Sequence, residues 1–102
     1  MAKPLYNERN IEILLKKLKE LSDDKLVSQR SVALFLLGKA KPPGGRGASG
    51  PVSTINTAIH DRTKWRSITR PMFYCILEFL EKQEQDIGYV DLSDIREQFE
   101  YS

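Results

Sequence analysis

The first third of the chain carries a helical pattern of hydrophobic positions. Between Asn7 and Leu21, leucine and isoleucine recur at spacings of three and four residues, with lysine and glutamate between them. This periodicity predicts an amphipathic helix. Asn7 is suited to cap its start, Glu8 lies in the favourable first turn, and the Ser22-Asp23-Asp24 run predicts an end near Ser22.

A second apolar segment follows, and then a segment without any hydrophobic period. Ser28 precedes the mostly apolar run 29–37, which Gly38 closes, and this punctuation favours a short buried helix over a strand at 32–37. Residues 39–51 (KAKPPGGRGASGP) hold three prolines and four glycines. They predict a flexible loop, and its glycines do not fit the spacing of a phosphate-binding P-loop.

Two more helices are predicted beyond Pro51. Val52, Ile55 and Ile59 fall on one helical stripe. Thr69-Arg70-Pro71 opens the next helix, because threonine can cap it and proline fits the first turn. The apolar body of that helix predicts the centre of the core: Met72, Phe73, Ile76, Leu77, Phe79 and Leu80.

The C-terminal tail, residues 83–102, is acidic yet carries apolar residues. Alternation over 87–92 indicates a short strand, and Ser93 is suited to cap a last helical turn reaching Phe99. Such a tail either folds back or meets a partner. We take it to supply the contacts of a homodimer, through Ile87, Tyr89, Val90 and Phe99.

These elements predict a mainly α fold, a compact bundle of four to five helices containing a helix-turn-helix-like unit. With 102 residues, 40% of them hydrophobic, the chain has the size and composition of one globular domain, 1–102, with a core at about 7–82. No apolar run is long enough for a membrane span, and the N-terminus has no signal-peptide pattern. We expect a cytoplasmic protein, in the host cytoplasm if it is viral.

Charge is distributed unevenly along the chain. The net charge is only +2, but residues 39–70 hold seven basic side chains and one acidic one, whereas residues 71–102 hold two basic and eight acidic ones. A basic middle third is a candidate footprint for a polyanion. Pairing of the basic and acidic blocks within the fold is the other interpretation.

Catalytic chemistry has little support. The chain has one histidine and one cysteine, so it can form no intramolecular disulfide and lacks the spacings of metal sites. We expect no enzyme, no cofactor and no metal.

The predicted helix after Pro51 is better suited to recognition. Its small polar side chains can hydrogen-bond base edges in a major groove, and the cations that follow can bind phosphates. The candidate base contacts are Ser53, Thr54, Asn56, Thr57 and His60. The candidate phosphate contacts are Gln29, Lys41, Arg46, Arg62, Lys64, Arg66 and Arg70. The alternative is a solvated helix face followed by a basic turn.

The stretch VSQRSVALFLLG (27–38) resembles the first helix of the helix-turn-helix in the lambda repressor and Cro family. GPVSTINTAIHDRTKWRSITRPMFYCILEFL (50–80) is similar to the recognition helix and following helices of that family. The resemblance implies that Gln29 contacts phosphate and that Ala33 packs against the recognition helix. It also implies that Ser53, Asn56, Thr57 and His60 face bases while Ile55 and Ile59 anchor the helix. The chain departs from the family in its Gly/Pro-rich segment, which adds about ten residues between the two motif helices.

Two functions follow as hypotheses. The first is a transcriptional regulator of phage, virus or mobile-element type, a repressor-like homodimer that binds double-stranded DNA. The second is a non-enzymatic interaction module, such as a viral inhibitor or accessory factor, docking on a host protein. Trp65 fits a core position better than a stacking platform for single-stranded bases.

Overall fold

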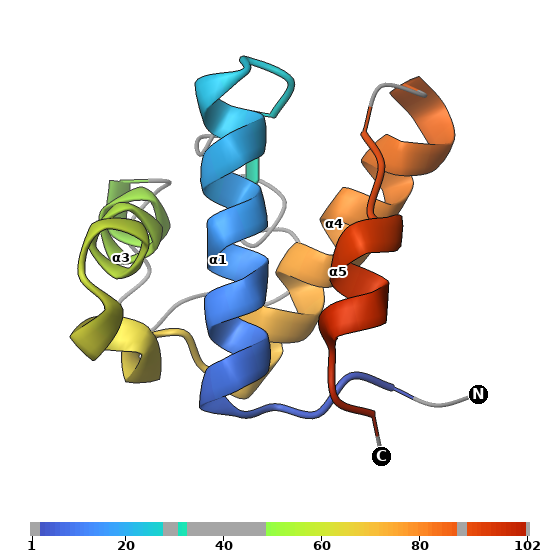
Figure 1. Ribbon diagram of the computed structural model, residues 1–102. Helices are drawn as coiled ribbons and strands as arrows, with labels where there is room; N and C mark the ends of the chain where they lie inside the picture. Colours follow the sequence, from blue (N-terminus) through green and yellow to red (C-terminus); the bar gives the residue numbers. More distant parts are fainter. Residues whose placement is uncertain (1–2, 28–30, 33–48, 88–89, 102) are drawn as a thin grey trace.

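The computed structural model describes residues 3–27, 31–32, 49–87 and 90–101, and this part of the chain is mainly helical (Figure 1). The prediction of a mainly α fold is therefore confirmed. The elements are α1 (Glu8–Asp23), α3 (Ser49–His60), the short 3-10 helix η1 (Arg62–Ser67), α4 (Arg70–Ile87) and α5 (Ser93–Gln98).

Helix α1 follows its sequence pattern closely. The Asn7 side chain accepts a hydrogen bond from the Asn10 N–H at 2.9 Å, which satisfies one of the unpaired donors of the first turn. Ile11, Leu14 and Leu18 are fully buried. The helix ends at Asp23, and two residues later Lys25, with a φ of 61°, lies in the left-handed region, where the Leu26 N–H donates back to the Leu21 carbonyl.

Helix α4 provides the centre of the core, as predicted. Phe73, Ile76 and Leu80 are fully buried. The Phe73 ring meets Tyr6 and Phe99 edge-on, at centroid separations of 5.8 and 6.5 Å. Thr69 caps the helix weakly, since its hydroxyl oxygen accepts from the Met72 N–H at 3.5 Å.

The C-terminal tail folds back onto the chain and corrects two predictions. No strand occurs in the described part of 87–92, where Ile87 is the last residue of α4 and residues 90–92 are irregular. Val90 and Phe99 are buried in the chain's own core together with Leu92 and Ile95, so their side chains are not exposed to form a dimer surface. In the described part of this segment, Val90 and Leu92 are buried although the backbone is irregular. Tyr89 and the Ile87 side chain lie outside the description, and dimerisation stays a prediction.

Asn10 joins the tail to the N-terminal segment. It is completely buried, and its amide nitrogen donates to the carbonyls of Leu5 and Glu100 at 2.8 and 2.9 Å. Its amide oxygen accepts from the Glu100 N–H at 2.9 Å. The Leu5 N–H also donates to the Glu100 carbonyl, and Pro4 and Tyr101 form an isolated antiparallel bridge. The two ends of the chain are thus held side by side.

The middle of the chain is described only in part. Ser31 and Val32 are helical and Val32 is fully buried, which agrees with a buried helix there. The remaining residues of that predicted helix, and residues 39–48 of the predicted loop, lie outside the described residues. Ser49–Pro51 belong to α3 rather than to the loop, because proline is tolerated in the first helical turn.

Helix α1 lies between two groups of elements. In Figure 1, α3 and η1 lie on one side of α1, and α4 and α5 lie on the other. Helix α1 contacts α3, η1 and α5. The described part of the basic segment that belongs to α3 and η1 and the acidic C-terminal third are therefore on opposite flanks of the same helix.

Candidate nucleic-acid interface

Helix α3 has a buried face and an exposed polar face. Ile55 and Ala58 are fully or almost fully buried, and Ile59 packs against the core from a partly buried position. The opposite face is exposed and carries Ser53, Asn56, Thr57 and His60. Their spacing of three, four and seven residues places these four side chains along one line of the helix, which we call the α3 polar stripe.

The other predicted base contact, Thr54, is half-buried and lies beside the stripe. Of the predicted anchors, Ile55 and Ile59 are where the sequence placed them, whereas the side chain of Val52 is not described. Ala58 was missed. Its position, three residues beyond Ile55, places it on the same helical face, but a small side chain such as alanine contributes little to a pattern of bulky apolar residues.

The turn after α3 is fixed by Asp61. Its Oδ1 accepts from the Thr63 N–H at 3.0 Å and from the Thr63 hydroxyl at 2.6 Å, capping η1. These hydrogen bonds from Thr63, with the nearby charge of Lys64, lower the pKa of Asp61. Asp61 is the only acidic residue in 49–70, and it is engaged in capping its own turn.

Two of the cations in this region stack on aromatic rings. The Arg66 guanidinium carbon lies 5.3 Å from the centroid of Trp65, and that of Arg70 lies 5.2 Å from the centroid of Tyr6. Both arginines are exposed. Stacking holds a guanidinium by its face, so that its N–H donors, which lie in the plane, stay available to an anion.

Tyr6 itself is fixed, because its hydroxyl donates to the Ile68 carbonyl. Trp65 is half-buried and packs against the core, which agrees with the core position that the sequence favoured. The role of Tyr6 beneath Arg70 was not predictable from sequence spacing, since more than sixty residues separate the two.

The structure describes only some of the remaining predicted phosphate contacts. Lys64 is exposed on η1. Arg62 is the first residue of η1, but its side chain is not described. Gln29, Lys41 and Arg46 lie outside the described residues. Lys64 and Arg66 of η1 and Arg70, the first residue of α4, follow the α3 polar stripe along the chain, and we call these three the η1 cations.

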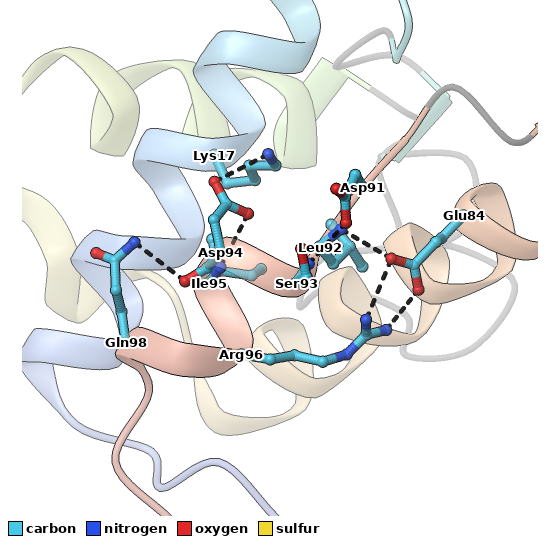
Figure 2. Close-up of polar contacts among 9 residues, drawn as sticks. All are labelled: Lys17, Glu84, Asp91, Leu92, Ser93, Asp94, Ile95, Arg96 and Gln98. Atoms are coloured by element: carbon cyan, nitrogen blue, oxygen red, sulfur yellow. Dashed lines mark hydrogen bonds and ion pairs between the residues drawn. The ribbon is translucent and has the colours of Figure 1, made fainter.

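The flank on the other side of α1 is acidic and internally paired (Figure 2). Glu84 binds the Arg96 guanidinium through both carboxylate oxygens, at 2.6 and 3.1 Å, and accepts from the Leu92 N–H at 2.8 Å. Hydrogen bonds from Arg96 and then from Leu92 lower the pKa of Glu84, and the same pairing raises the pKa of Arg96. Lys17 of α1 pairs with Asp94 at 3.2 Å.

The described residues contain no group of three or more histidine, cysteine, aspartate or glutamate side chains placed to hold a metal ion. None of the helices described is long and apolar enough to span a membrane. Comparison with protein-family models, curated proteins and solved structures found no match to this chain.

Proposed function

We propose that this chain is a sequence-specific protein that binds double-stranded DNA, with α3 as its recognition helix. The observation that carries the proposal is the exposed α3 polar stripe, which holds no acidic side chain and is followed along the chain by the η1 cations. The single acidic side chain of that region is engaged in a cap. Such a surface offers hydrogen-bond donors and acceptors without repelling a polyanion.

The chemistry of the stripe matches base recognition in a major groove. Asn56 can pair with the N6 and N7 atoms of adenine, and Ser53 and Thr57 can donate to or accept from several bases. From residue 53 to residue 60 a helix rises about 10 Å, which is close to three base-pair steps. A major groove about 12 Å wide admits a helix of this kind.

The η1 cations complete the interface in the proposal. Stacked arginines and a lysine at the end of the helix would bind phosphates and fix the register of the stripe on the duplex. The acidic flank formed by α4 and α5 lies on the other side of α1, where it would face away from the DNA (Figure 1).

A finer assignment, a repressor-like transcriptional regulator of phage, virus or mobile-element type that acts as a homodimer, rests on the resemblance of 27–38 and 50–80 to the lambda repressor and Cro family. Docking on a host protein was favoured by the apolar residues of the tail. Val90, Leu92, Ile95 and Phe99 are buried within the chain, which accounts for that feature without a partner.

A selection from random duplex DNA, followed by fluorescence anisotropy on the enriched duplex and on a shuffled one, tests the proposal. We expect preference for the enriched duplex and a steep loss of affinity with salt. If each η1 cation neutralises one phosphate, the log–log slope is about −2.7, at about −0.9 per phosphate. Absence of duplex binding at low ionic strength would refute DNA binding. Equal affinity for both duplexes would leave DNA binding but refute specificity.

A further inference from the structure

A surface trough runs over the exposed side of α1. Its volume is about 380 Å³, and its walls come from α3 and η1 on one side and from α5 on the other. The part of the wall that belongs to α3 and η1 consists of Ala58, Ile59 and Trp65, and the opposite wall consists of Ile95 and Gln98. We call this feature the α1 trough.

The trough combines apolar side chains with a basic rim. Ile13, Ile59 and Trp65 are partly buried and pack on the core, so their remaining surface borders the trough. Four cations of α1 line it, against one acidic side chain, Glu12; these cations are Arg9, Lys16, Lys17 and Lys19.

The four cations are not equally available. Lys17 is paired with Asp94 at 3.2 Å, and Lys19 is paired with Asp23 at 3.5 Å along the same helix. Arg9 and Lys16 are exposed and make no ion pair within the described part of the chain. The positive charge of the rim is therefore carried mainly by these two side chains.

We propose that the α1 trough docks an acidic amphipathic helix of a partner protein. Bulky apolar residues on one face of such a helix would cover Ile13, Ile59 and Trp65, and its flanking carboxylates would meet Arg9 and Lys16. Charge complementarity selects the acidic partner. The apolar surface favours a protein helix over a nucleic-acid backbone, because phosphates gain nothing from covering isoleucine. The inference does not rest on DNA binding, since no residue of the α3 polar stripe or the η1 cations lines the trough. The two surfaces meet at Trp65, because Arg66 stacks on the same ring.

The sole tryptophan of the chain reports on this site directly, because Trp65 lines the trough. The probe is a synthetic helical peptide of about 16 residues, the length of α1, with leucine at positions i, i+3, i+4 and i+7 and glutamate on both flanks. A matched peptide carries lysine in place of every glutamate. We expect the acidic peptide to shift Trp65 emission in a saturable manner and the basic peptide to leave it unchanged.

Variants of the full chain locate the binding. The pair Arg9→Glu and Lys16→Glu should lower the affinity for the acidic peptide about tenfold or more, because it turns attraction at the rim into repulsion. The neutral pair Arg9→Gln and Lys16→Gln serves if charge reversal prevents folding. Lys64→Glu, a charge reversal outside the trough, should leave peptide affinity unchanged while weakening the DNA binding proposed above.

Several results would overturn the inference. Equal binding of the basic peptide, or wild-type affinity in the Arg9 and Lys16 variants, would show that the trough does not select an acidic helix. Displacement of the peptide by duplex DNA, with loss of DNA binding in the same variants, would assign the trough to nucleic acid. Self-association that disappears in these variants on analytical ultracentrifugation would assign it to a second copy of the chain. Failure of DNA binding alone would leave the inference intact.

Discussion

Ionic groups are used differently on the two flanks of α1. On the α4–α5 flank, Glu84 pairs with Arg96 and Asp94 pairs with Lys17. Around η1, Arg66 and the first residue of α4, Arg70, rest on aromatic rings, and the one acidic side chain of 49–70 caps a turn. Charges paired within the chain serve its stability and offer little to a ligand, whereas the stacked cations are held in place and form no ion pair with the residues that the structure describes. Removing polar groups should therefore reduce stability on the first flank and binding on the second.

The largest effect on stability is expected at Asn10. Asn10→Ala removes three hydrogen bonds and leaves the Leu5 carbonyl and the Glu100 N–H without this partner, while the Glu100 carbonyl keeps its bond from the Leu5 N–H. The loss should lower the free energy of unfolding by about 3 kcal/mol. Urea denaturation followed by circular dichroism measures the change. Asn56→Ala is the matched control, since it removes the same side chain from an exposed position and should cost less than about 0.5 kcal/mol. Equal losses in the two variants would contradict the role assigned to Asn10.

The burial of Asn10 could not be predicted from the sequence. The spacing of leucine and isoleucine predicted α1, and the apolar residues of 72–80 predicted the core helix. Both were predictable because a helix with one continuous buried face has a regular spacing of apolar residues in its sequence. Nothing local distinguishes the buried Asn10 from a polar residue on the exposed side of α1, since its partners lie at the two ends of the chain. The Glu84–Arg96 pair and the stacking of Arg70 on Tyr6 could not be predicted from the sequence for the same reason.

The candidate site was easier to predict than these long-range contacts. Ser53, Asn56, Thr57 and His60 share one face because of helical geometry alone, so their spacing was sufficient. The tail was harder. Its apolar residues were recognised, but an apolar residue that packs in its own core and one that packs on a partner have the same sequence pattern. Only the fold assigns Val90 and Phe99 to the core.

The largest effect on binding is expected from the η1 cations. The double variant Lys64→Ala and Arg66→Ala should weaken binding to every duplex by about tenfold to thirtyfold, because phosphate contacts carry no sequence information. Its salt slope should fall by about 1.8, from two lost phosphate contacts. Anisotropy titrations over a range of salt concentrations measure both quantities. A loss confined to one duplex, or an unchanged slope, would remove these residues from phosphate binding.

Asn56→Ala should act on specificity rather than on general affinity. Loss of a bidentate contact to a base costs about 1–3 kcal/mol of discrimination, so the preferred duplex should lose affinity while a shuffled duplex is bound as before. Competition between the two duplexes measures the ratio. His60→Ala should act in the same direction, since it shares the α3 polar stripe. If Asn56→Ala changes neither affinity nor preference, α3 is not the recognition helix.

The smallest effect is expected on the paired flank, and it depends on pH. Hydrogen bonds from Arg96 and Leu92 lower the pKa of Glu84 from its usual 4.5, so the folded state binds this proton more weakly than the unfolded state. The stabilisation is therefore fully present above pH 4.5 and is lost as the pH falls through the lower pKa of the folded protein.

Glu84→Gln keeps an acceptor for the Leu92 N–H and removes the charge. At neutral pH it should cost less than about 1 kcal/mol, because the Arg96 side chain is 45% exposed and the pair is screened by solvent. Urea denaturation of both proteins between neutral and acidic pH should show the difference shrinking below pH 4.5. A difference that stays constant with pH would mean that the carboxylate charge contributes nothing, and the Glu84–Arg96 pair would no longer support the contrast between the two flanks.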